Sequence, residues 1–183
     1  EAAARRGPQA ARGAEATAEE EQLFERGDSS APETYPVQAG DARRGSHLMI
    51  KGHPCRCIEV SASKAGKKHG HAKAHIVAVD VFTGKKYEDV FAASHYIDVP
   101  YVKRMEYQVV NVDLETGEVS LLHESGVTRD DLNLPTFVKA GEQTDDDRRL
   151  QRDLVEAFDM GQTVMVAVVS ALGEEKIVDM KTL

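Results

Sequence analysis

The chain has 183 residues, of which 41% are hydrophobic and 30% are charged, and its formal net charge is −8. This hydrophobic content is sufficient for packed cores and excludes wholesale disorder, while the acidic balance argues against a protein that coats DNA through general charge. No apolar stretch approaches the roughly 18 residues of a membrane-spanning helix, so we expect no segment that crosses a membrane.

The first 33 residues differ in composition from the rest of the chain. They consist mainly of Ala, Glu, Arg, Gly and Ser, and Pro32 and Pro36 mark their end. Such a segment cannot bury enough apolar surface to order itself, so we predict a mobile tail over residues 1–33.

Residues 34–101 carry short β-strand patterns separated by turn residues. The pattern predicts strands at 47–51, 55–60, 74–82 and 86–91, with hairpin turns at 52–54 and 83–84. In the second strand, alternation places Cys55, Cys57 and Glu59 on one face and the intervening residues on the other. Several short strands at this spacing predict a small β-barrel.

The segment Asp98–Tyr101 contains Pro100 and is the predicted junction to a second domain over residues 102–183. Further strands are predicted at 107–112, 118–122 and 164–169. Between them, Thr144 can cap a helix that carries Asp145–Asp147 in its first turn and ends before Gly161. Its apolar side chains recur at helical spacing; they are Leu150, Leu154, Val155 and Phe158. Strands with one helix in a segment of this length indicate an OB-type barrel, so the predicted fold is mainly β.

The most distinctive stretch is residues 61–73, which read Ser-Ala-Ser-Lys-Ala-Gly-Lys-Lys-His-Gly-His-Ala-Lys. It contains no acidic and no large apolar residue, whereas acidic side chains outnumber basic ones over residues 113–160. A cationic, glycine-bracketed loop between two strands is suited to meet a polyanion or to present a lysine.

Other interpretations of this loop are weaker. Cys55, Cys57, His53, His69, His71 and His75 could suggest zinc, but Cys-x-Cys with His-x-His is not a standard ligand spacing, and lysines repel a cation. Gly66-Lys67 lacks the upstream glycine and the following Ser or Thr of a P-loop. No carboxylate within the loop orients its histidines for acid–base catalysis.

A disulfide between Cys55 and Cys57 would be strained, so reduced thiols are expected, in a cytosolic or nuclear setting. We therefore predict no metal, no cofactor and no catalytic residue. The remaining alternative to a functional loop is an ordinary basic turn that contacts only solvent.

The loop resembles the signature of the eukaryotic translation initiation factor 5A family, Ser-x-Ser-Lys-Thr-Gly-Lys-His-Gly-His-Ala-Lys. The likeness extends from about residue 34 to the C-terminus. It includes residues 80–89 (Asp-Val-Phe-Thr-Gly-Lys-Lys-Tyr-Glu-Asp), 98–100, 121–122, 129–132, 134–135 and 169–171.

The resemblance implies an N-terminal SH3-like β-barrel over 34–101 and a C-terminal OB fold over 102–183. It implies that one loop lysine becomes hypusine, through an aminobutyl group from spermidine added by deoxyhypusine synthase and then hydroxylated by deoxyhypusine hydroxylase. It also implies cytoplasmic binding at the ribosomal E site. There the modified side chain would reach the P-site tRNA and support slow peptide-bond formation, notably at consecutive prolines, and termination.

The chain departs from the signature by one additional lysine, because Gly66-Lys67-Lys68-His69 stands where the family has a single lysine between Gly and His. Counting from the longer downstream match assigns hypusine to Lys68, and counting from Gly66 assigns it to Lys67. The remaining predicted recognition residues are Lys64, Gly66, His69, Gly70, His71 and Lys73. The doubled lysine also leaves open an unmodified RNA-binding paralogue that acts as a passive clamp through its OB barrel and basic loop. An enzyme is the least favoured class.

Overall fold

The computed structural model describes residues 32–63, 72–138 and 143–183, and residues 32–183 form one compact unit. The predicted mobile tail falls almost entirely on residues 1–31, which lie outside the described residues. Within the described ranges, no helix is both long and apolar enough to span a bilayer. The elements are β1 Thr34–Gln38, the 3-10 helix η1 Ala39–Asp41, β2 His47–Ile50, β3 His53–Ser63, β4 Lys73–Asp80, β5 Lys86–Ala92, β6 Tyr96–Pro100, β7 Lys103–Val112, β8 Glu118–Leu122, β9 Thr128–Asn133, the 3-10 helix η2 Pro135–Phe137, α2 Asp145–Asp159, β10 Val164–Ala171 and β11 Glu174–Thr182.

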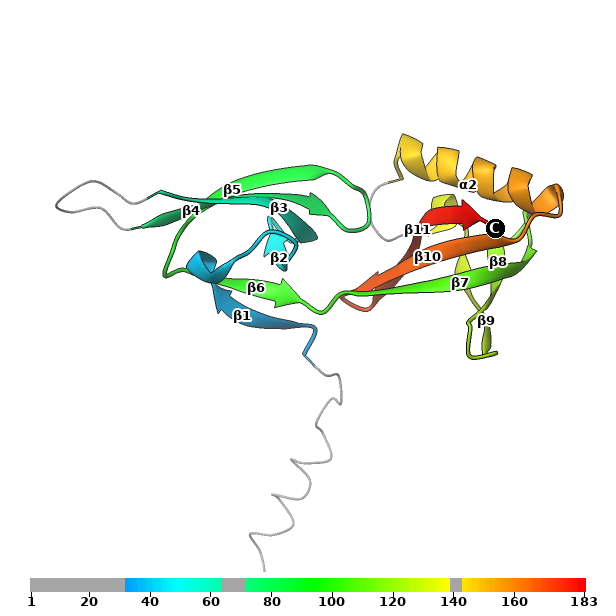
Figure 1. Ribbon diagram of the computed structural model, residues 1–183, viewed down its shortest axis with the longest axis horizontal. Helices are drawn as coiled ribbons and strands as arrows, with labels where there is room; N and C mark the ends of the chain where they lie inside the picture. Colours follow the sequence, from blue (N-terminus) through cyan, green and yellow to red (C-terminus); the bar gives the residue numbers. More distant parts are fainter. Residues whose placement is uncertain (1–31, 64–71, 139–142) are drawn as a thin grey trace, which may run out of the picture. The chain divides into compact units, whose positions relative to one another are not determined.

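Strands β1 to β6 form the N-terminal barrel. Antiparallel strands β2-β3-β4-β5 make one sheet, and β1 pairs with β6 in a second (Figure 1). The sequence predicted the first sheet but missed β1 and β6, because Thr34 and Pro100 become partners only when the chain folds back on itself. The inward side chains form one apolar cluster: Ala39, Ala42, Leu48, Ile50, Cys55, Cys57, Ala74, Ile76, Ala78, Ile97 and Val99.

A β-bulge in β3 corrects the predicted alternation of that strand. Cys57 pairs with Ala78 and Glu59 with Val77, so Ile58 is an extra residue on the β3 side. A bulge of this kind reverses the alternation of the residues after it. Glu59 is therefore exposed instead of sharing the buried face of Cys55 and Cys57, and Val60 packs against the core.

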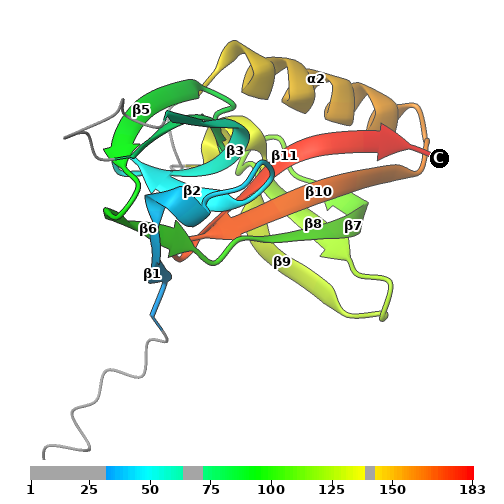
Figure 2. The ribbon, with the colours of Figure 1, turned by 60° about the vertical axis from the view of Figure 1, so that its left-hand side comes forward.

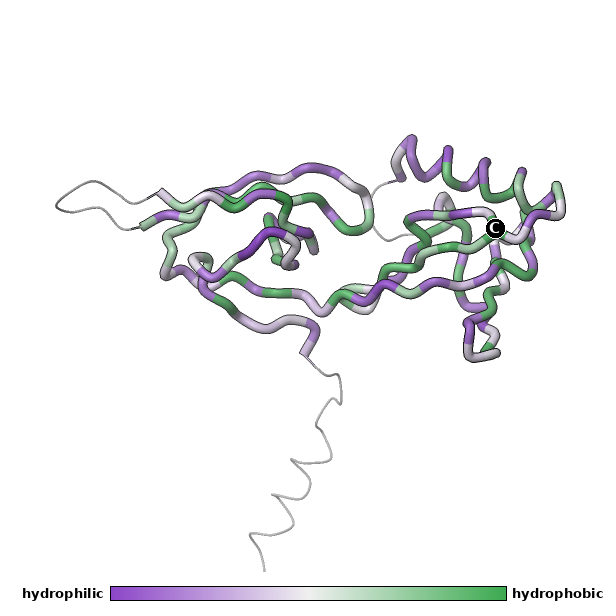
Figure 3. Tube along the Cα trace, viewed as in Figure 1, coloured by the Kyte–Doolittle hydropathy of each residue, from purple (hydrophilic) through white to green (hydrophobic). Residues whose placement is uncertain are grey.

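The remaining strands form the C-terminal barrel, with the order β11-β10-β7-β8-β9. Figure 2 shows β10 beside β7 and β11, in agreement with their antiparallel pairing. Figure 3 shows β10 as largely hydrophobic and α2 as largely hydrophilic. The core is built mostly from branched aliphatic side chains; it contains Tyr107, Val109, Val119, Leu121, Leu132, Leu134, Leu154, Ala157, Val164, Val166, Val168 and Ile177.

The single α-helix follows the predicted signals closely. The Thr144 side chain accepts a hydrogen bond from the backbone N–H of Asp147, and the Asp147 carboxylate accepts one from the backbone N–H of Thr144, which completes a capping box. Leu154 is fully buried, and Leu150, Val155 and Phe158 pack against the same core. Gly161 has a φ of 73°, the left-handed conformation that favours glycine after a helix.

Arg129 joins the two outer strands of the five-stranded sheet. From β9, its guanidinium donates to the Asp131 carboxylate at 2.7 Å and to both oxygens of Glu175 in β11 at 2.6 and 3.2 Å. Bidentate pairs of this type are among the stronger ion pairs in proteins. Side-chain bonds therefore connect β9 to β11 where no backbone ladder does.

Lys176 is a buried lysine that connects the two barrels. Its side chain is 1% exposed, and its ammonium donates to the Asp147 carboxylate at 2.8 Å and to the backbone carbonyl of Phe82 at 3.1 Å. Phe82 follows β4 and packs with Val169 and Ala171 of β10. A buried ammonium needs such partners because its desolvation is otherwise costly.

Candidate functional site

The β3–β4 hairpin carries the two ends of the basic segment. The strands pair from Cys55 with Asp80 to Ser63 with Lys73, and Lys73 also pairs with Ala92 of β5. Ser61–Ser63 therefore belong to a strand, although the sequence pattern placed them in the loop. The two small hydroxyl residues give little strand signal by themselves, and their pairing with β4 supplies the backbone hydrogen bonds.

Of the predicted recognition residues, Lys73 lies in the described part of the chain, where its side chain is exposed at the start of β4. The others, Lys64, Gly66, Lys67, Lys68, His69, Gly70 and His71, lie outside the described residues. The choice between Lys67 and Lys68 therefore stays a prediction.

A hydrogen-bonded row crosses the outer face of the hairpin beside this segment. His75 Nε2 lies 2.6 Å from Glu88 Oε1, and His75 Nδ1 lies 3.4 Å from Ser61 Oγ. A carboxylate only accepts, so Nε2 carries the proton, and in the neutral ring Nδ1 accepts from the serine hydroxyl. The row connects β3, β4 and β5. No local pattern in the sequence predicts this row, because it depends on the register that sets Ser61 opposite His75.

At the opposite end of the hairpin, a buried carboxylate organises the β4–β5 turn. Asp80 accepts hydrogen bonds from the backbone N–H groups of Phe82 at 2.7 Å and Thr83 at 3.2 Å. His53 Nδ1 lies 3.2 Å from the same carboxylate, and the His53 ring stacks on Tyr87 with centroids 4.7 Å apart. This cluster fixes the register from which the hairpin extends toward the basic segment.

The two thiols are free, as predicted, and both are buried in the barrel core. Burial raises the pKa of Cys55 to about 12, with a further contribution from the Asp80 carboxylate, and burial also raises the pKa of Cys57. Both remain protonated near neutral pH and are poor nucleophiles and poor metal ligands. Across the three described ranges, no three His, Cys, Asp or Glu side chains are arranged to hold a metal ion.

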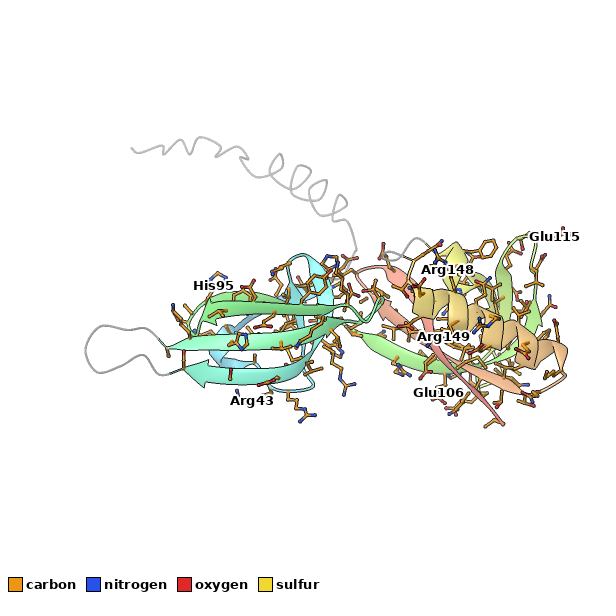
Figure 4. The ribbon with its side chains drawn as sticks, turned by 90° about the horizontal axis from the view of Figure 1, so that it is seen from above. Arg43, His95, Glu106, Glu115, Arg148 and Arg149 are labelled. Carbon is orange, nitrogen blue, oxygen red and sulfur yellow. The ribbon has the colours of Figure 1, made fainter. Side chains whose placement is uncertain are left out.

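The two barrels differ in whether their lysines and arginines form ion pairs. In the described part of residues 32–101, none has a carboxylate oxygen of another described residue within 4.0 Å; they are Arg43, Arg44, Lys51, Arg56, Lys73, Lys85 and Lys86. In the described part of residues 102–183, all except Lys103 are paired; they are Arg104, Arg129, Arg148, Arg149, Arg152, Lys176 and Lys181. Figure 4 shows Arg43 at the edge of the N-terminal barrel and Arg148 and Arg149 on α2. The cations available to a polyanion are therefore concentrated on the barrel that carries the basic segment.

Two family models match the chain in succession. Residues 32–95 match "Translation initiation factor 5A-like, N-terminal", and residues 101–181 match "Eukaryotic elongation factor 5A hypusine, DNA-binding OB fold". Among curated relatives, eukaryotic translation initiation factor 5A-3 of Arabidopsis thaliana is 47% identical over 89% of this chain and 96% of the relative. Factor 5A-1 of Solanum lycopersicum is 48% identical over 89% and 96%.

Solved structures give the same result. A translation initiation factor eif-5a family protein from Naegleria fowleri superposes with a TM-score of 0.71 and 49% identity, covering 82% of this chain and 99% of that one. The Methanococcus jannaschii factor 5A superposes with a TM-score of 0.53 and 26% identity, covering 82% and 98%. These likenesses confirm the predicted fold class, a mainly β chain with an SH3-like barrel followed by an OB fold with one helix. They also confirm the resemblance on which the functional expectations rest: the chain belongs to the eukaryotic translation initiation factor 5A family.

Proposed function

We propose that this translation factor binds the ribosomal E site through its N-terminal barrel and carries hypusine on Lys68, with Lys67 as the alternative. Deoxyhypusine synthase would transfer the aminobutyl group of spermidine to the lysine, and deoxyhypusine hydroxylase would complete the side chain. The single observation that carries the proposal is the family signature at residues 61–73 in a chain of this family.

The charges and the hairpin support this proposal physically. The basic segment begins and ends on paired strands, and the barrel around it holds unpaired cations. Such a surface attracts the phosphates of ribosomal and transfer RNA, and their affinity for it should fall as salt is added.

The role of the modified side chain would be positional. A longer, polycationic arm can hold the acceptor end of the P-site tRNA in a reactive geometry, which lowers the entropic part of the barrier at slow sites such as consecutive prolines and at termination. No side chain of this protein is then required to make or break a bond, so we propose a factor and not an enzyme. The working compartment would be the cytoplasm, with the nucleus as a second location.

The first test is peptide mass spectrometry across residues 61–73 of protein isolated from its native cells. A hypusine mass increment at Lys68 or Lys67 supports the proposal and decides the register. Lys67→Arg and Lys68→Arg form a matched pair, because each keeps the charge and removes one acceptor amine. We expect one variant to lose the modification and most of the rescue of proline stalls, and the other to keep both.

The doubled lysine favours one second candidate, an unmodified RNA-binding clamp. It predicts an unmodified loop and full activity of both arginine variants. Co-sedimentation with ribosomes at physiological salt tests the part that the two candidates share, and protein that stays in the supernatant would refute both.

A further inference from the structure

A cavity of about 470 Å³ opens in the N-terminal barrel between β1, η1, β2 and β6, away from the basic segment in sequence. Its walls include the apolar side chains of Leu48, Val99 and Val102. Polar groups enter it from Asp41, Ser46 and His47. A volume of this size, apolar with a few polar groups, is typical of small-ligand sites.

Two exposed tyrosines stand at this cavity. The rings of Tyr35 and Tyr101 have centroids 5.2 Å apart at 46°, and the residues are 42% and 54% exposed. Backbone contacts hold both residues: Tyr35 pairs with Val99 within the β1–β6 sheet, and the Tyr101 N–H, just after β6, donates to the Glu33 carbonyl at 3.1 Å. A pre-positioned aromatic pair loses little conformational entropy when a planar group stacks on it.

Two arginines lie next in sequence to the cavity residues, and Asp41 in the cavity wall carries the opposite charge. Arg43 and Arg44 follow the cavity residues Asp41 and Ala42, and the Arg43 guanidinium donates to the Ala42 carbonyl at 3.0 Å, which holds it near the cavity. Within the described ranges, neither arginine has a carboxylate within 4.0 Å. Burial, and next the Arg56 charge, lower the pKa of His47, so its ring is neutral near pH 7 and offers one donor and one acceptor.

We propose that this cavity is a binding site for single-stranded RNA, in which a nucleobase stacks on the Tyr35–Tyr101 pair and the adjoining phosphates contact Arg43 and Arg44. Aromatic faces next to a cationic track are the general means of binding single strands. A proline-rich peptide would also suit an aromatic groove, but it does not use unpaired arginines. The site goes beyond the proposed function, because it uses neither hypusine nor the basic segment.

The test uses the full-length protein and an oligouridylate of about six nucleotides, with affinity measured by fluorescence anisotropy. The double variant Tyr35→Ala/Tyr101→Ala should weaken binding by about 5- to 150-fold. Tyr35→Phe/Tyr101→Phe should keep the affinity, because phenylalanine retains the stacking face. Tyr96→Ala is the matched control, since Tyr96 is 63% exposed on β6 but does not line the cavity. Ultraviolet cross-linking should map to Tyr35 or Tyr101.

A loop variant, Lys67→Ala/Lys68→Ala, separates this site from the proposed function. We expect it to lose hypusine-dependent activity but to lower the affinity for the oligouridylate much less than Tyr35→Ala/Tyr101→Ala does. Three results would overturn the inference: unchanged affinity in the double alanine variant, cross-links confined to residues 61–73, or tyrosine-dependent binding of a proline-rich peptide with none of RNA.

Discussion

The N-terminal barrel leaves its described cations unpaired, whereas the C-terminal barrel pairs all of its described cations but Lys103. Both are small, mainly β units, so fold class does not explain the difference. In the C-terminal barrel, Arg129 and Lys176 bond to groups on other elements and support the fold. In the N-terminal barrel, apolar packing forms the core and the cations remain available for a partner. The same residue types thus form ion pairs in one barrel and stay exposed and unpaired in the described part of the other.

The largest expected effect is a loss of stability when the buried ammonium group of Lys176 is removed from the C-terminal barrel. Lys176→Ala leaves the Asp147 carboxylate buried without its ammonium partner and should lower the free energy of unfolding by about 3–5 kcal/mol in urea titrations. Lys181→Ala is the matched control, because it breaks an exposed pair with Glu106 and should cost less than about 1 kcal/mol. Equal losses in the two variants would show that burial does not distinguish these pairs.

The next expected effect concerns binding to a polyanion. Lys85→Ala/Lys86→Ala and Arg148→Ala/Arg149→Ala change the net charge equally, but only the second pair has acidic partners. We expect the lysine variant to elute from heparin at clearly lower salt and to reduce the slope of log affinity against log salt by about 1–2. A larger effect of the arginine variant would contradict the inference that the unpaired cations of the N-terminal barrel are the ones available to a polyanion.

The two barrels should also respond to acid at different pH. The pKa of His47 is lowered from 6.5 by burial, so protonation favours the unfolded chain, and its stabilisation is lost as pH falls below 6.5. Hydrogen bonds from Arg129 lower the pKa of Asp131 below 3.8; its stabilisation is present above that value and is lost as pH falls through the folded pKa.

Amide hydrogen exchange measures both responses. Protection near Leu48 should weaken before protection near Leu132 as the pH is lowered. His47→Gln should remove the first response, and Asp131→Asn should flatten the second. Simultaneous loss in both barrels would mean that they unfold as one unit.

The smallest expected effect concerns the row beside the basic segment. Glu88→Gln replaces the charge-assisted bond to His75 and should cost about 0.2–1 kcal/mol by thermal denaturation. Glu59→Gln serves as the control on the same outer face, because none of the described side chains bonds to Glu59. If both substitutions lower the stability equally, the hydrogen-bonded row adds no stability beyond the general effect of surface charge.

How far the sequence predicts this structure depends on whether a signal is local. The helix was predictable because Thr144, the first-turn aspartates and the apolar stripe act within a few turns of one another. Strands at residues 47–50, 86–92 and 164–171 were predictable for the same reason. Local signals also gave the basic segment and hence the family.

Features that depend on distant partners were missed. Strand β9 reads Thr-Arg-Asp-Asp-Leu-Asn, which lacks alternation, and it is stabilised by pairing with β8 and by the bonds of Arg129 to β11. The bulge at Ile58 requires knowledge of the β4 register. Lys176 would be assigned to the surface from its residue type alone, because lysine is almost never fully buried unless it is paired. The tyrosine cavity depends on the pairing of β1 with β6.

The paired ends of the β3–β4 hairpin have a consequence for how this family can vary. Ser63 is held opposite Lys73, and Lys73 is held beside Ala92, so residues gained or lost between positions 63 and 73 leave the register of the barrel unchanged. Closing a connection that is one residue longer costs only about 0.1 kcal/mol of chain entropy. Mutation can therefore sample the length and the lysine number of the basic segment at almost no cost to folding, and the additional lysine of this chain is a change of that kind.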